Sequence, residues 1–169
     1  AARTGAPVAE RSTVLVVEDD RSVREALARA LELEGYRVLT DPVLRNGAAF
    51  LRRLPQAADI RSHTDVDLAV ISHLHHDHLD LPSLRSLRPD AVVLVPEGAA
   101  RWLRAKRVGH PVVELRVGES FTLGPLRVTA TDAVHSGRRE PFGPDAAAVG
   151  YLLEVGPALV YFAGDTDLF

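Results

Sequence analysis

The chain has 169 residues and a formal net charge of −3 at pH 7, and 46% of its residues are hydrophobic. This composition supports a packed core, excludes a wholly disordered chain and lacks the basic excess that is typical of nucleic-acid-binding proteins. Because the sequence contains no cysteine, disulfides and thiol nucleophiles are excluded, and a bound metal would need histidine and carboxylate ligands.

The first predicted elements are a strand, a helix and a second strand between residues 13 and 40. Residues 1 to 12 are expected to form a flexible lead-in without a signal peptide or membrane span, which favours a cytoplasmic protein. The aliphatic run TVLVV at 13 to 17 predicts a buried strand. A capping box from Ser22 to Glu25 begins the helix, Gly35 ends it, and residues 37 to 40 form the next strand. These residues therefore predict a β-α-β segment.

Predicted strands and helices continue to alternate through the middle of the chain. Residues 43 to 54 follow a break at Asp41-Pro42 and are expected to be helical or irregular. Buried strands are predicted at 67 to 72 and 91 to 95. A short helix is expected from Leu81-Pro82, because proline is tolerated in a first turn, and another helix from 98 to 106. This alternation predicts an α/β fold.

The chain becomes β-rich after residue 112. Strands are expected at 112 to 115, 121 to 123, 126 to 131, 149 to 155 and 158 to 163. The pairs Gly124-Pro125 and Gly156-Pro157 are turn signals at hairpin spacing. We therefore expect two hairpins in this half.

The nine residues 72 to 80, SHLHHDHLD, contain four histidines and two aspartates directly after a predicted buried strand. In an extended segment His73 and His75 project to the same side, and a bend after them brings Asp77 and His78 to a second point nearby. Imidazole and carboxylate ligands suit zinc, iron or manganese. The alternative is a solvated histidine-rich loop, but the H-x-H-x-D-H spacing after a strand favours a metal site.

This segment resembles the H-x-H-x-D-H motif of the metallo-β-lactamase-fold hydrolases. Three further segments match the family in order: LTDP at 39 to 42, HSGR at 135 to 138 and AGDTD at 163 to 167. Together they are most similar to the branch that contains L-ascorbate-6-phosphate lactonases and N-acyl-phosphatidylethanolamine phospholipase D enzymes. The resemblance implies a partial αββα sandwich, with a hydrolase domain over residues 41 to 169.

The resemblance also implies a set of metal ligands. One ion would be bound by His73, His75 and His135, a second by Asp77 and His78, and Asp165 would bridge the two. The implied cofactor is one or two Zn²⁺ ions, with Mn²⁺ or Fe²⁺ as alternatives. His76 falls on a variable position of the motif and is expected to be a surface neighbour, whereas His63 and His110 match no motif.

The implied reaction is hydrolysis of a lactone, phosphodiester or related bond by a metal-bound hydroxide that Asp77 orients. Arg138 is a candidate for contact with an anionic group of the substrate, because its planar fork suits phosphate, although a solvated arginine explains it equally well. The expected partners are a small-molecule or lipid-like anionic substrate and, in an oligomer, further copies of the chain; no nucleic acid is expected.

Two departures from the family pattern leave alternatives open. The family has a further metal-binding histidine after the GDTD segment, so we expect a chain truncated at its C-terminus and a second metal that lacks one ligand. Residues 13 to 40 resemble instead the start of a response-regulator receiver domain, with Asp19 and Asp20 as its acidic pair. The alternatives to a hydrolase are therefore a receiver-like signalling module and a metal-binding fragment without catalytic activity.

Overall fold

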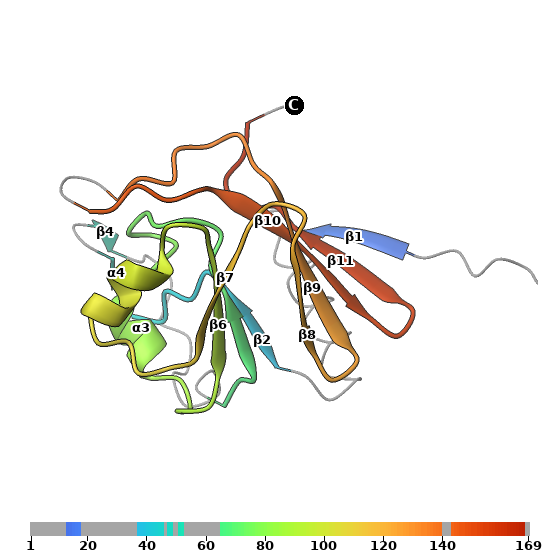
Figure 1. Ribbon diagram of the computed structural model, residues 1–169, viewed down its shortest axis with the longest axis horizontal. Helices are drawn as coiled ribbons and strands as arrows, with labels where there is room; N and C mark the ends of the chain where they lie inside the picture. The colour runs from blue at the N-terminus through green and yellow to red at the C-terminus, as the bar shows by residue number, and fades with distance from the viewer. Residues whose placement is uncertain are drawn as a thin grey trace, which may run out of the picture.

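The computed structural model (Figure 1) describes residues 13–17, 37–45, 47–48, 51–52, 65–139 and 143–167. These residues contain two short helices, α3 (Leu81–Arg85) and α4 (Ala100–Ala105). The strands are β1 (Thr13–Val17), β2 (Val38–Thr40), β3 (Gly47–Ala48), β4 (Leu51–Arg52), β5 (Leu68–Val70), β6 (Val92–Pro96), β7 (Val112–Leu115), β8 (Ser120–Leu123), β9 (Leu126–Asp132), β10 (Val149–Val155) and β11 (Ala158–Phe162).

The first main sheet has the order β2-β5-β6-β7, and all of its strands are parallel. Its crossovers carry α3 and α4, as parallel neighbours require. Alternate side chains of β5 point to opposite faces. Leu68 and Val70 pack toward the second sheet, whereas Ala69 and the following Ile71 pack toward the helices. This sheet is therefore buried on both faces.

The second main sheet has the order β1-β11-β10-β9-β8 and is antiparallel except for the β1–β11 pair. Its apolar face, with Val128, Tyr151 and Leu153, packs against Leu68 and Val70 of the first sheet. Figure 1 shows α3 and α4 on one side of the parallel sheet and the second sheet on the other. The described layers are thus helix, sheet and sheet, in agreement with the expected α/β sandwich.

Several predicted elements are confirmed. The hairpins β8–β9 and β10–β11 turn at Gly124-Pro125 and Gly156-Pro157, where the glycines have φ of 56° and 53°. Both helices of the middle segment are present, and Pro82 lies in the first turn of α3. The strand predicted at 67 to 72 is shorter, because the chain after Val70 turns into the histidine segment.

The first half differs from two predictions. Residues 43 to 54 were expected to be helical or irregular; of these, 47–48 and 51–52 form the short antiparallel strands β3 and β4, and 43 to 45 are irregular. Strands β1 and β2 belong to different sheets, so residues 13 to 40 do not form one parallel β-α-β sheet unit. The physical reason is that both main sheets offer β1 a free edge, and β1 pairs with β11 rather than with β2. The helix expected at 22 to 35 and the lead-in at 1 to 12 lie outside the described residues.

The two described helices contain five and six residues. Neither helix of the described part is long and apolar enough to cross a membrane.

Candidate metal centre

The histidine segment begins just after β5, at the end of the parallel sheet where the carboxyl ends of its strands lie. Residues 75 to 78 form a tight turn in which the amides of His78 and Leu79 donate to the carbonyl of His75 at 3.2 and 2.9 Å. Asp80 then caps α3. A short extended segment followed by a turn therefore presents three histidines of the motif from one strand end.

Three imidazoles converge at this strand end. His73 Nε2 lies 2.9 Å from His75 Nδ1, which lies 3.3 Å from His135 Nε2. His135 comes from the other sheet, after β9, so the group is assembled from both sheets. Ligand atoms of these three residues all lie within 4.8 Å of one another. The structure thus brings together the three residues predicted for the first metal.

Asp165 joins the imidazoles from the segment after β11. Its Oδ2 lies 3.2 Å from His78 Nε2, 3.8 Å from His135 Nε2 and 4.0 Å from His73 Nε2. The preceding Gly164 has φ of 62°, and a Cβ there would lie 2.5 Å from Ser72 Cβ. A side chain at position 164 would therefore displace the segment that places Asp165 Oδ2 beside these ring nitrogens.

Asp41 belongs to a second potential ligand group with His73 and His78, a role that the sequence analysis missed. Its carboxylate accepts from the Ser72 amide at 2.7 Å and pairs with His78 Nδ1 at 2.7 Å. The available signal was the LTDP segment: Asp41 follows β2, and the carboxyl ends of neighbouring parallel strands lie at the same edge. The pairing directs His78 Nε2 toward Asp165.

The protonation states follow from burial and neighbouring charges. Burial lowers the pKa of His73 to about 3, with further lowering by charges on His78, His75 and His135. Burial also lowers the pKa of His75. For His78, burial lowers the pKa, but the hydrogen bond and charge of Asp41 outweigh it and the net shift is upward. Burial raises the pKa of Asp41 more than His78 and Ser72 lower it.

The remaining predicted residues lie around these groups rather than in them. Asp77 is exposed and belongs to neither potential ligand group in the described residues, although its charge acts on His75 and His78. Arg138 is exposed, whereas the next residue, Arg139, is only 8% exposed and contacts His76. Sequence reasoning missed Arg139, because two adjacent arginines do not show which one points inward.

The donor set fits a transition metal. Ligand atoms on a tetrahedral ion with metal–nitrogen distances of about 2.0–2.1 Å lie about 3.3 Å apart, close to the 2.9 and 3.3 Å between the ring nitrogens of His73, His75 and His135. Neutral imidazole is the form that binds metal, and the lowered pKa of His73 keeps that ring neutral at pH 7. Nitrogen and carboxylate donors suit zinc, iron and manganese alike.

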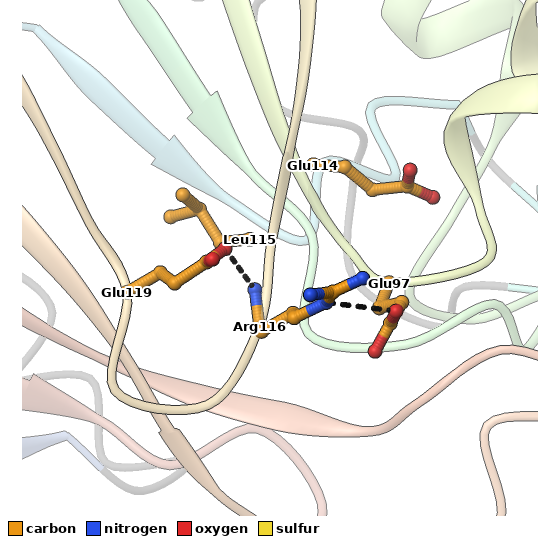
Figure 2. A pocket seen from close by; sticks show the side chains of 5 residues that line it. All are labelled: Glu97, Glu114, Leu115, Arg116 and Glu119. Atoms are coloured by element: carbon orange, nitrogen blue, oxygen red, sulfur yellow. Dashed lines mark hydrogen bonds and ion pairs between the residues drawn. The ribbon is translucent and has the colours of Figure 1, made fainter.

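A small pocket lies at the ends of β6 and β7, lined by Glu97, Glu114, Leu115, Arg116 and Glu119 (Figure 2). Arg116 Nε donates to Glu97 at 2.9 Å, and the Arg116 amide donates to Glu119 at 2.9 Å. Glu114 accepts from the amide of Ala100 at the start of α4, at 3.0 Å. These glutamates hold two loops and a helix end, and no histidine lines the pocket.

Comparison with known proteins identifies the family that the chain resembles. Residues 36–169 match the family described as Beta-lactamase superfamily domain. The N-acyl-phosphatidylethanolamine-hydrolyzing phospholipase D 1 of Caenorhabditis elegans is 33% identical over 126 residues, which cover 64% of this chain and 35% of that protein. A UPF0173 metal-dependent hydrolase of Methanoregula boonei is 33% identical over 136 residues, which cover 79% of this chain and 53% of that protein.

Among solved structures, the chain is similar to CmlA, a diiron beta-hydroxylase from Streptomyces venezuelae. The TM-score is 0.54 at 28% identity, over 78% of this chain and 26% of that chain. The chain spans about a third of the length of the nematode relative and about half that of the archaeal one.

Proposed function

Because the chain belongs to the beta-lactamase superfamily domain family, with the metallo-β-lactamase fold, we propose that it acts as a metal-dependent hydrolase. The observation that carries the proposal is the convergence of imidazoles from both sheets on the Asp165 carboxylate, with Oδ2 within 4.0 Å of three ring nitrogens. Such a donor set at the edge of a buried sheet costs desolvation energy, which a bound cation offsets. A signalling role has no comparable support in the described residues.

In this proposal His73, His75 and His135 hold one cation, Asp77 and His78 hold a second, and Asp165 is shared. The 2.9 and 3.3 Å spacings support the three histidines, and the 3.2 Å contact between Asp165 Oδ2 and His78 Nε2 supports those two residues. Asp77 is the weakest member by geometry. The diiron description of CmlA makes iron a competitor of zinc for this donor set.

A divalent cation at these donors would lower the pKa of a bound water toward neutrality and polarise the bond under attack. The chain's own residues prepare the donors. Asp41 accepts from His78 Nδ1, which leaves the lone pair of Nε2, on the side of Asp165, available to bind a metal. Ser72 Oγ lies 2.9 Å from His73 Nδ1 and orients that ring in the same way. The exposed Asp77 carboxylate is available to orient the attacking water.

For the substrate we propose an anionic small molecule or lipid with a phosphodiester or lactone bond. The phosphodiester is supported by the name of the nematode relative, which describes hydrolysis of a phosphatidylethanolamine derivative by a phospholipase D. Arg138 is exposed three residues after His135 and is proposed to meet the anionic group.

Metal analysis of the purified chain tests the proposal. We expect up to two equivalents of Zn²⁺, Mn²⁺ or Fe²⁺ after reconstitution, and hydrolysis of bis(p-nitrophenyl) phosphate or a model lactone. His73→Ala and His135→Ala should each lose at least one equivalent. His110→Ala is the matched control, because His110 lies outside both potential ligand groups.

Failure of the wild-type chain to bind any of these metals would exclude the hydrolase. Binding of one equivalent without turnover of either substrate would instead identify a metal-binding chain without catalytic activity.

A further inference from the structure

Arg139 is a buried cation beside the histidine segment that the proposed reaction leaves unused. We infer that Arg139 is a positioning residue, which holds the turn of residues 75 to 78 in the conformation that binds metal; the inference rests on the proposed function. Arg139 is 8% exposed, and among the described residues no carboxylate forms an ion pair with it. The groups that compensate for the burial of this charge are therefore its hydrogen-bond partners, Leu74, Leu79 and His76.

The guanidinium spans the two ends of the turn. Nη1 donates to the carbonyl of Leu74 at 2.7 Å and to the carbonyl of Leu79 at 3.0 Å. Both leucines are fully buried, so their carbonyls need donors from the protein. These two carbonyls flank the turn that carries His75 and His78. One planar group thus fixes the distance between the start and the end of the turn.

The second arm of the guanidinium sets the position of His76. Nη2 lies 2.9 Å from His76 Nδ1. Arginine only donates hydrogen bonds, so Nδ1 must accept and the His76 proton must lie on Nε2. This contact turns His76 away from the other imidazoles and explains why the fourth histidine of the segment does not join them. A third hydrogen bond therefore holds the turn in one orientation.

Helix α4 supplies a surface for the guanidinium. The Arg139 guanidinium carbon lies 5.0 Å from the centroid of the Trp102 ring, a distance typical of cation–π contact. Trp102 itself packs against the buried residues under the parallel sheet. The position of Arg139 is therefore fixed by the hydrophobic core as well as by its hydrogen bonds.

Arg139 also ties the turn to the segment that carries His135. Its amide donates to the carbonyl of Pro144 at 3.1 Å, and its carbonyl accepts from Gly143 at 2.7 Å. Gly137, between His135 and Arg139, is buried so closely that a Cβ would lie 2.1 Å from the carbonyl oxygen of Ala146. The backbone at Gly137 and Arg139 is therefore held against residues 143 to 146. A side chain that reaches from it to residues 74 to 79 sets the separation of His75 and His135.

The test is titration of the metal-free chain with Co²⁺, followed by visible absorption. We expect Arg139→Ala to weaken Co²⁺ binding tenfold or more and to change the positions or intensities of the cobalt bands. Arg139→Lys should give an intermediate affinity, because one ammonium replaces two directed donors. Trp102→Leu should give a smaller loss. Arg101→Ala, an exposed arginine of the same helix, is the matched control and should behave as wild type.

Circular dichroism establishes that each variant is folded at the titration temperature. A folded Arg139→Ala variant with wild-type affinity and spectrum would overturn the inference, even if its melting temperature fell. If Arg139→Ala does not fold, the Co²⁺ affinities of Arg139→Lys and Trp102→Leu test the inference instead. Wild-type Co²⁺ affinity in both variants would overturn it. Wild-type chain that binds no Co²⁺ is a different outcome, since it removes the proposed function and with it the basis of this inference.

Discussion

His73 is the most deeply buried of the titratable side chains around Asp165, with no exposed surface. Its Nδ1 lies against Ser72 Oγ and its Nε2 against His75. Burial is the main reason why its pKa falls to about 3, and the neighbouring imidazoles add to the effect. A ring in this position is ready to bind a cation but is costly to protonate.

We expect the metal-free chain to lose stability in acid because of His73. The folded pKa of about 3 lies below the ordinary value of 6.5, so the unfolded chain takes up the proton first. Stability is therefore lost as the pH falls below 6.5, and the loss continues to about pH 3. Between pH 7 and pH 5 the loss should be about 2 kcal/mol.

Urea denaturation of wild type and His73→Gln at both pH values measures this effect. The comparison cancels the opposite contribution of His78, whose raised pKa stabilises the fold as the pH falls. Equal pH dependence in the two proteins would show that His73 is not the group responsible.

Among individual residues, the sequence predicted the candidate ligands that residue type and spacing identify. It missed the residues whose role depends on a tertiary contact. His73, His75, His78, His135 and Asp165 all lie close together in the structure. Asp41 and Arg139 act on partners 37 and 65 residues away along the chain. The LTDP segment signals Asp41 but does not identify His78 as its partner, and the sequence around Arg139 does not identify Leu74.

Helix α3 illustrates how an element too short to be stable alone is fixed by its first residues. It has five residues, well below the length at which an isolated helix is stable in water. Asp80 caps it by accepting from the Ser83 amide at 3.0 Å, and pairs with Arg45 Nε at 2.9 Å. Burial raises the pKa of Asp80, but the bonds from Arg45 and Ser83 outweigh it and lower the pKa overall.

Loss of this cap should destabilise the fold. Asp80→Ala removes the acceptor for both the Ser83 amide and Arg45, and we expect the free energy of unfolding to fall by about 2 kcal/mol. Asp80→Asn keeps one oxygen and should cost about half as much. The measurement is urea denaturation at pH 7. Asp90→Ala, an exposed aspartate that pairs with Arg88, is the control, and an Asp80→Ala effect no larger than that of the control would contradict the prediction.

Elements with local signals were predictable, and those that depend on the choice of a partner strand were not. The proline in the first turn of α3 and the two Gly-Pro turns each fix the backbone locally, so the helix and both hairpins were correctly expected. The run TVLVV predicts a strand but not its neighbour. Its pairing with β11 rather than β2 follows from contacts distant in sequence.

In the whole molecule, the two sheets meet directly beneath the imidazoles. Tyr151 of β10 is fully buried, and its hydroxyl donates to the carbonyl of Ile71, just after β5, at 2.9 Å. This bond links the sheet that carries His73 to the sheet that carries Asp165. The family resemblance predicted the layers, but not the contact that aligns them.

Tyr151→Phe should therefore lower the free energy of unfolding by about 1–3 kcal/mol, because the buried Ile71 carbonyl loses its donor while the ring still packs. Thermal or urea unfolding measures the change. Tyr161→Phe, on the neighbouring strand β11, is the matched control, because Tyr161 is partly exposed and its hydroxyl forms no hydrogen bond within the described residues. Equal stability of the two variants would show that the inter-sheet bond contributes nothing.

The assembly of the imidazoles from both sheets has a consequence for biosynthesis. Sixty residues separate His75 from His135, and at about 5–20 residues per second a ribosome needs roughly 3–12 s to make them. During that interval His73, His75 and His78 are present without His135, and Asp165 is translated later still. A nascent chain thus exposes three histidines to metal ions first. The complete donor set, with His135 and Asp165, exists only after the last hairpin has been translated.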